Sequence, residues 1–201
     1  NEGIASYESA QRQQPSAQVA LKLYSARREA NIPEPERALR EWLQRSPTDI
    51  DVHRVLVAYY EQTGDRERAI AEYERFAASG AVDPVSLNNL AWTLHERGDA
   101  RAITVARRAY EAAPEYPEIA DTYGWILVRT DKVADGLNVL KEALINAPDN
   151  PDIQYHLAYA YAKSGEKAQA AELLRKALVS ESFMSRADAE KLLQSLNGSG
   201  G

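Results

Sequence analysis

The sequence predicts an all-α protein in which similar pairs of helices repeat along the chain as a solenoid. The first observation is a turn residue that recurs at intervals of 34, 33 and 34 residues: Gly64, Gly98, Asp131 and Gly165. The second is a proline that marks the opposite end of three of these segments: Pro47, Pro114 and Pro148. A fixed period of this length is typical of repeat proteins, whose units bury one face against a neighbouring unit.

Each repeated segment contains the helical spacing of apolar residues twice. In the last segment it is carried by Tyr155, Leu157, Ala158 and Tyr161, then by Ala170, Leu173, Leu174, Ala177 and Leu178. The first helix begins at a capping residue followed by proline, as in Asn150-Pro151, where the missing N–H of proline costs nothing. It ends at the glycine, which adopts the left-handed conformation readily. Each unit is therefore predicted to be two antiparallel helices.

The period divides residues 1–196 into a single array. The predicted units are a partial repeat at 1–15, repeats at about 16–49, 50–83, 84–116, 117–150 and 151–184, and a capping helix at 185–196. The capping helix is expected because the last pair has no further repeat to cover its apolar face. Residues 197–201 are predicted to form a flexible tail. We expect at least ten helices and no sheet, in a chain that reads as a piece of a longer protein.

The amino-acid composition argues against several classes of function. The chain has 24 basic and 30 acidic residues, hence a net charge of −6, which argues against a nucleic-acid partner because phosphate binding requires a basic surface. It has no cysteine, which excludes disulfides, thiol catalysis and zinc sites of the cysteine type. No apolar run approaches the roughly 18 residues of a spanning helix. We expect the fragment to be soluble, with membrane attachment only through an anchor upstream of it.

The sequence predicts no enzyme active site. It contains no GxSxG, HExxH, phosphate-binding glycine loop or EF-hand loop. The three histidines, His53, His95 and His156, lie in different repeats at different places along their first helices, so a shared metal site is not expected. We therefore expect no catalytic residue, no metal and no cofactor.

These segments resemble the tetratricopeptide repeat (TPR), whose pattern of large, small and aromatic residues extends over about 34 positions. One copy is Leu157, Ala158, Tyr161, Ala170, Leu174 and Ala177, and another is Tyr123, Gly124, Leu127, Leu140, Ala143 and Pro148. In the second copy Gly136 replaces the alanine that the family has near the helix crossing. The resemblance implies a right-handed superhelix whose first helices line a concave groove for a protein or peptide segment.

Three longer strings are similar to a narrower family: LNNLAW at 87–92, DTYGWILV at 121–128 and PDIQYHLAYAYAK at 151–163. The similarity continues through Phe183, Arg186, Ala189, Leu192 and Leu193. The family comprises the C-terminal parts of large TPR lipoproteins encoded beside exosortase (PEP-CTERM) and exopolysaccharide gene clusters of Gram-negative bacteria. This resemblance implies a periplasmic or periplasm-facing, lipid-anchored protein that acts in assembly, export or sorting of envelope material.

Aromatic residues recur at one position of consecutive first helices. This aromatic track consists of Trp92, Trp125 and Tyr159, with Asn88, Asp121 and Tyr155 four residues earlier and His95 one turn after Trp92. The preceding repeat contributes Arg54 and Glu61 to the same face. Rings edged by hydrogen-bonding groups suit an extended peptide or a sugar chain. The alternative is that the rings pack between adjacent first helices.

The sequence therefore favours a non-enzymatic TPR scaffold that binds a protein or peptide segment within an envelope assembly, export or sorting system. Two other functions stay open. One is a scaffold that binds exopolysaccharide itself. The other is a substrate-positioning arm of an enzyme whose catalytic domain lies outside this sequence.

Overall fold

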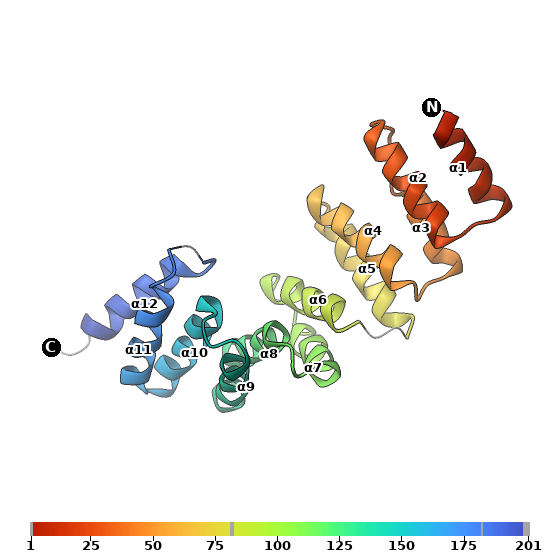
Figure 1. Cartoon of the computed structure of the whole chain (residues 1–201). Helices are drawn as coiled ribbons and strands as arrows, with labels where there is room; N and C mark the ends of the chain where they lie inside the picture. Colours follow the sequence, from red (N-terminus) through yellow and green to blue (C-terminus); the bar gives the residue numbers. More distant parts are fainter. Residues whose placement is uncertain (1, 81–82, 182, 199–201) are drawn as a thin grey trace. The chain divides into compact units, whose positions relative to one another are not determined.

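The computed structural model describes residues 2–80, 83–181 and 183–198. This part of the chain contains helices and no strand (Figure 1). The helices are α1 (Glu2–Gln13), α2 (Ala17–Glu29), α3 (Arg37–Arg45), α4 (Ile50–Gln62), α5 (Arg66–Ala78), α6 (Pro84–Glu96), α7 (Ala102–Ala112), α8 (Pro117–Arg129), α9 (Val133–Asn146), α10 (Pro151–Ser164), α11 (Lys167–Ala177) and α12 (Arg186–Gly198). The predicted all-α class is confirmed.

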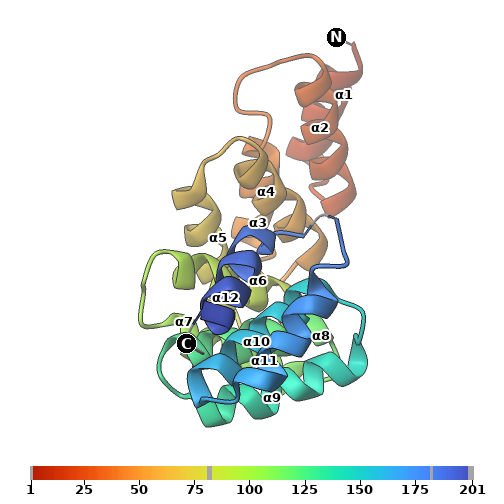
Figure 2. The same ribbon diagram turned by 90° about the vertical axis from the view of Figure 1, so that its left-hand side faces the viewer.

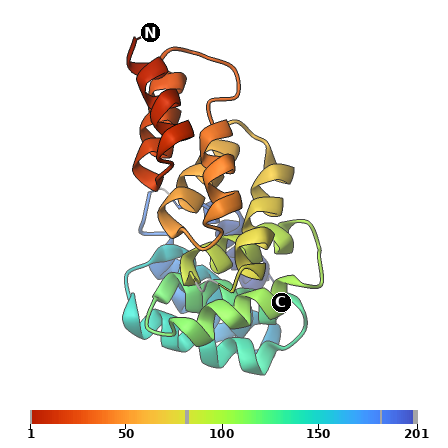
Figure 3. The ribbon, with the colours of Figure 1, turned by 90° about the vertical axis from the view of Figure 1, so that its right-hand side faces the viewer.

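The helices form two compact units that divide after Ser86, in the first turn of α6. In the N-terminal unit α1 packs against α2, α2 against α3, and α4 against α5 (Figure 3). In the C-terminal unit α7 packs against α8, α8 against α9, α9 against α10, and α10 against α11 (Figure 2). In each of these packed pairs the two helices follow one another in the chain. The repeat boundary predicted between residues 83 and 84 lies close to the division.

The turn that ends a first helix has the same conformation in four repeats. The marker residues all have positive φ angles, 74° at Gly64, 70° at Gly98, 63° at Asp131 and 89° at Gly165. In each turn the next residue donates a backbone hydrogen bond of 2.8–2.9 Å to the carbonyl five residues before it. This bond closes the C-terminus of a helix in the Schellman motif. The residues that recur in the sequence therefore mark a recurring backbone conformation. Asp131 adopts this left-handed conformation although it is not glycine.

Side chains cap several helix starts, including the start predicted at Asn150. The Ser16, Asp49 and Asp65 side chains each accept a hydrogen bond from a backbone N–H three residues later, at 3.1–3.2 Å. Asn150 caps α10 in the same way, and Pro151 follows it. Each cap satisfies a backbone donor that has no partner within its own helix. The starts of α2, α4, α5 and α10 are therefore encoded locally.

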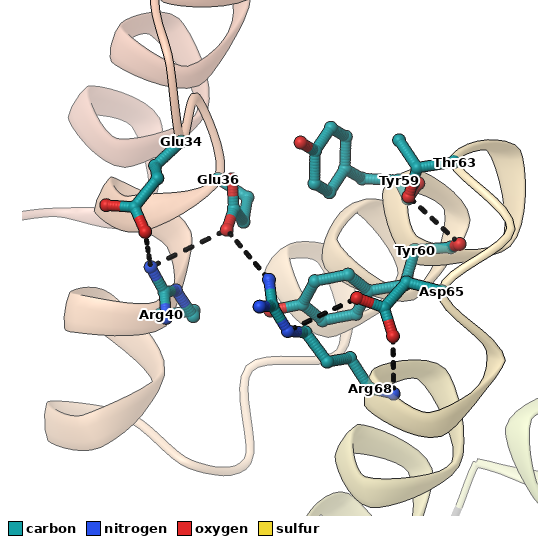
Figure 4. A network of polar contacts seen from close by, with 8 residues as sticks. All are labelled: Glu34, Glu36, Arg40, Tyr59, Tyr60, Thr63, Asp65 and Arg68. Carbon is teal, nitrogen blue, oxygen red and sulfur yellow. Dashed lines mark hydrogen bonds and ion pairs between the residues drawn. The ribbon is translucent and has the colours of Figure 1, made fainter.

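The irregular turn at 31–35, between α2 and α3, is held by a buried carboxylate (Figure 4). Glu36 is 1% exposed, and its Oε1 lies 3.5 Å from Arg40 Nη2 and 3.9 Å from Arg68 Nη1. Arg68 belongs to α5, so the ion pair ties this turn to the next helix pair. Burial and the nearby Glu36 carboxylate raise the pKa of Tyr59 on α4. The positive charges of Arg40 and Arg68 thus compensate for the removal of the Glu36 carboxylate from water.

Two glycines allow α8 and α9 to approach closely. A Cβ atom on Gly124 would lie 2.7 Å from Leu140 Cγ, and one on Gly136 would lie 2.5 Å from Val128 Cγ2 and 2.8 Å from the Gly124 carbonyl oxygen. These distances are shorter than van der Waals contact. The substitution of glycine for the family's alanine at position 136 therefore has a steric reason.

The last helix covers the end of the array, as predicted. Ala189 of α12 is fully buried and forms a cluster with Leu174 of α11 and Ala158 of α10. The cluster is flanked by partly buried apolar residues on both sides: Leu173, Leu178, Phe183, Leu192, Leu193 and Leu196. The Arg186 guanidinium donates hydrogen bonds to the carbonyls of Leu178 and Ser180, beyond the end of α11. The α12 helix therefore buries apolar surface that the last pair would otherwise expose.

The predicted flexible tail is partly wrong. Asn197 and Gly198 belong to α12, and residues 199–201 lie outside the described part of the chain. No helix within the described ranges is both long and apolar enough to cross a bilayer.

We predict that Gly136→Ala destabilises the C-terminal unit. Helix propensity alone favours alanine by about 0.5–1 kcal/mol, but the added methyl group overpacks the α8–α9 contact, for which a cost of about 1–3 kcal/mol is typical. Gly3→Ala in α1 is the control, because no atom lies within 4 Å of its added Cβ. Urea denaturation followed by circular dichroism measures both variants. A Gly136→Ala midpoint at or above that of the wild type would contradict the steric account.

Candidate binding surface on the first helices of the C-terminal unit

An aromatic cluster lies on the first helices of the C-terminal unit, with Trp125 of α8 at its centre. The Trp125 ring stacks on His156 of α10 with centroids 4.2 Å apart, and Tyr159 approaches it edge-on at 5.1 Å. The Tyr155 ring belongs to the same cluster, with its centroid 5.9 Å from that of Trp125 and 5.5 Å from that of His156. Equivalent positions of neighbouring repeats therefore do come together, as the spacing predicts.

The centre of the cluster is packed rather than open. Trp125 is 7% exposed and Tyr155 is 6% exposed. Burial, followed by the nearby charge of Asp188 on α12, raises the pKa of Tyr155 to about 12. The structure corrects the groove assignment for these two residues: neighbouring helices cover them, and the packing alternative describes them.

Three members of the aromatic track lie at the accessible edge of this cluster. Trp92 of α6 and Tyr159 of α10 are partly exposed and pack against the buried centre. His95 is also partly exposed, with its ring centroid 6.0 Å from that of Trp92. Trp92, His95 and Tyr159 are therefore the aromatic members of the track that keep part of their surface exposed to solvent.

Arg129 is the residue of this surface that the sequence analysis missed. Its guanidinium carbon lies 5.3 Å from the Trp125 ring centroid and 5.8 Å from that of Tyr159. The side chain is exposed, and no carboxylate in the described part of the chain pairs with it. The available signal was its position four residues after Trp125 in α8, because residues four apart lie on one helix face. Two rings orient the guanidinium and leave its N–H donors available to a ligand.

The polar members of the track have different environments. Asp121 accepts from His156 Nδ1 at 2.8 and 2.9 Å, beneath the Trp125 ring. This pair fixes the imidazole, so Asp121 supports the cluster. Asn88 is partly buried, and its Oδ1 is enclosed without a hydrogen-bond partner among the described residues.

The environment of His95 favours its neutral form. Burial lowers the pKa of His95, and the nearby Arg129 guanidinium and His156 side chain lower it further, whereas Glu96 opposes the shift. At neutral pH the imidazole therefore offers one donor and one acceptor.

The remaining two predicted residues, Arg54 and Glu61, belong to the N-terminal unit and have structural partners there. Arg54 makes a two-pronged ion pair with Asp83 at 2.8 and 3.2 Å, and Glu61 accepts a hydrogen bond from Tyr73 at 3.0 Å. Burial raises the pKa of Asp83, but hydrogen bonds from Arg54 and Ser86 outweigh that effect and lower it. Arg54 thus compensates a buried carboxylate at the start of α6.

No group of three potential metal ligands occurs within the residues that the structure describes. His53 and His156 are both buried in aromatic surroundings, His53 against Phe76 and His156 against Trp125. The arrangement on the first helices offers hydrogen bonds and ring faces, which suit binding rather than bond-making chemistry.

Comparison with protein families identifies the repeats. The tetratricopeptide repeat model matches residues 56–117 and 124–189, more than half of the chain. The chain belongs to the tetratricopeptide repeat family and is a protein-interaction scaffold of that class.

Two curated relatives match most of the chain. A TPR repeat-containing protein of Pseudomonas aeruginosa is 27% identical over 164 residues, which cover 78% of this chain and 27% of that protein. Cellulose synthase operon protein C of Pseudomonas fluorescens is 25% identical over 166 residues, which cover 78% of this chain and 13% of that protein. The chain spans about a quarter or less of the length of these relatives.

Solved structures share the fold. YrrB, described as a TPR protein with an unusual peptide-binding site, matches with a TM-score of 0.71 and 18% identity, covering 94% of this chain and 99% of that one. MamA of Desulfovibrio magneticus, whose solved chain runs from residue 41 to its end, matches with a TM-score of 0.63 and 21% identity, covering 74% of this chain and 83% of that one. At these identities the likeness concerns the fold.

We predict that Trp125→Ala is a stability variant. Removing a buried indole that contacts His156 and Tyr159 should cost about 3–5 kcal/mol of folding free energy. Tyr116→Ala is the control, because Tyr116 is 51% exposed and should change stability by about 0.5 kcal/mol or less. Chemical denaturation measures both. A loss at Trp125 as small as that at Tyr116 would show that the cluster does not stabilise the unit.

We also predict that Arg129→Gln raises the pKa of His95. The substitution removes a positive charge that disfavours the imidazolium, whereas Arg175→Gln on α11 keeps that charge in place. Imidazole chemical shifts followed by NMR across a pH titration report the pKa directly. An unchanged His95 titration in Arg129→Gln would mean that the two side chains do not share one surface in solution.

Proposed function

We propose that this chain is a non-enzymatic scaffold that binds an extended protein or peptide segment on the first helices of its C-terminal unit. The binding surface would consist of Trp92, His95, Arg129 and Tyr159. The observation that carries the proposal is the exposed Arg129 guanidinium, which lies over the buried Trp125 ring and the partly exposed Tyr159 ring and has no carboxylate partner among the described residues.

The chemistry of this surface suits a peptide. A peptide presents carbonyl and carboxylate acceptors that the guanidinium can engage, and apolar side chains that pack against ring faces. The buried Trp125 and the Asp121–His156 pair hold the surface in place before binding. A preformed surface loses little conformational entropy when the partner docks. The similarity in fold to YrrB, whose description includes a peptide-binding site, is consistent with this use.

We further propose that the scaffold acts in the production or export of a cell-surface polysaccharide, on the periplasmic side of a Gram-negative envelope. Similarity to cellulose synthase operon protein C supports this setting. So does the resemblance to the TPR lipoproteins of exosortase and exopolysaccharide systems. Attachment to the membrane would come from an upstream anchor.

Direct binding of the polysaccharide is the second candidate function. Trp92 and Tyr159 present ring faces beside polar groups, an arrangement that also suits the flat apolar face of a sugar. Cello-oligosaccharides are the natural probe, because one relative belongs to a cellulose synthase operon.

We predict that Trp92→Ala and Tyr159→Ala weaken peptide binding by about 1–3 kcal/mol each, as aromatic hot spots do, without loss of helix content. Peptides of twelve residues are first selected from a phage-displayed library on the wild-type chain, and their affinities for each variant are then measured by calorimetry. Tyr116→Ala serves as the matched surface control.

Equal affinities for wild type and both variants would overturn the peptide surface. Binding of cellohexaose in place of any selected peptide, with the same dependence on Trp92, would instead support the polysaccharide function.

A further inference from the structure

Two adjoining grooves in the N-terminal unit are rich in arginine. The first has a volume of about 300 Å³ and lies between α1 and α3, with residues of α2 between them. The second has a volume of about 550 Å³ and lies between α3 and α5. Arg37 and Glu41 of α3 line both, so the two grooves are continuous along this helix. We call them the arginine grooves.

Arginine is the commonest residue type in the lining of these grooves. They are lined by five arginines, Arg12, Arg27, Arg37, Arg40 and Arg75, and by two carboxylates, Glu8 and Glu41. Glu41 engages Arg37 at 2.9 Å, and Glu72 engages Arg75 at 2.6 Å. The positive charges available to an anionic partner are therefore those of Arg12, which has no ion-pair partner among the described residues, and of the weakly paired Arg27 and Arg40.

Two of the guanidinium groups have unused hydrogen-bonding capacity. Arg27 approaches its carboxylate partner Glu8 no closer than 3.9 Å, and Arg40 approaches Glu36 and Glu34 at 3.5 and 3.9 Å. The Nε atoms of Arg27 and Arg40 are enclosed and without a hydrogen-bond partner. Partly buried guanidinium groups without acceptors lose hydration that nothing in the fold replaces. Carboxylates entering the grooves would supply acceptors to the outer nitrogens.

Gln11 provides the second, independent observation. It lines the first groove, it is 8% exposed, and its Oε1 has no partner among the described residues. A primary amide can donate to a carbonyl and accept from an N–H, which are the two groups that a peptide backbone offers. The first groove therefore combines cations for a carboxylate with an amide for the main chain.

We propose that the arginine grooves bind an acidic peptide segment of a partner protein, with one carboxylate near Arg27 and a second near Arg40. Recesses beside partly buried guanidinium groups favour side-chain carboxylates on a flexible chain over the flat surface of a bilayer. A nucleic acid would require phosphate contacts over an extended basic surface, which two arginine-lined grooves do not provide. This site lies in the N-terminal unit and is separate from the proposed surface on α6, α8 and α10.

The test uses the full chain and a fluorescein-labelled peptide of five Glu-Ser repeats, with five Gln-Ser repeats as the uncharged match. Fluorescence anisotropy at 50 and 200 mM NaCl should show binding of the Glu-Ser peptide alone, weaker at the higher salt concentration. Arg27→Gln and Arg40→Gln should each raise the Kd by about tenfold, because charge-assisted hydrogen bonds are lost. Arg107→Gln on α7 is the matched control and should leave the Kd unchanged.

Arg12→Gln keeps the test decisive if the partly buried arginines prove necessary for folding. Arg12 is exposed and has no ion-pair partner in the described ranges, and its loss should weaken the Glu-Ser peptide while thermal stability is retained. Equal binding of the two peptides, or equal loss in Arg107→Gln, would overturn the proposal. So would arginine-dependent binding of oligogalacturonate or of phosphatidylglycerol vesicles without binding of the peptide.

Discussion

The left-handed turn at the end of each first helix is the constraint on which the other features depend. It closes the helix with one recurring backbone hydrogen bond and directs the following helix back along the first. Because the turn recurs every 33 or 34 residues, equivalent positions of the first helices within the C-terminal unit fall on one surface. Trp125 and Tyr159 meet for this reason, although they lie on different helices. The same recurrence places α9 against α8 closely enough that only glycine fits at position 136.

Burial then divides the aromatic track into a supporting part and an accessible part. Trp125 and Tyr155 are covered by side chains of neighbouring helices, whereas Trp92 and Tyr159 keep a free face. The supporting part matters for binding because it fixes the accessible rings and the Arg129 guanidinium before a partner arrives. The buried part of this cluster thus contributes to folding stability, and its accessible part is the proposed binding surface.

Charge is distributed in an equally local way. Buried carboxylates in the N-terminal unit are matched by arginines, as Glu36 is by Arg40 and Asp83 by Arg54 (Figure 4 shows the first of these). Arg27, in contrast, is left with weak compensation beside a recess. The net charge of the whole chain, −6, therefore does not indicate the local charge of either candidate surface. The positions of individual guanidinium groups decide which partners these surfaces can accept.

The sequence by itself determined the helices, their pairing and the turns, because capping residues, marker glycines and apolar spacing act over a few neighbouring residues. It also placed Trp92, Trp125 and Tyr159 at equivalent positions. Only the tertiary structure decided that Trp125 is buried, that the Arg129 guanidinium lies over the Trp125 ring, and that Arg54 forms an ion pair with Asp83. These outcomes depend on side chains contributed by other helices. The burial of a residue depends on the side chains of other helices that pack over it. The spacing of residues within one helix does not contain that information.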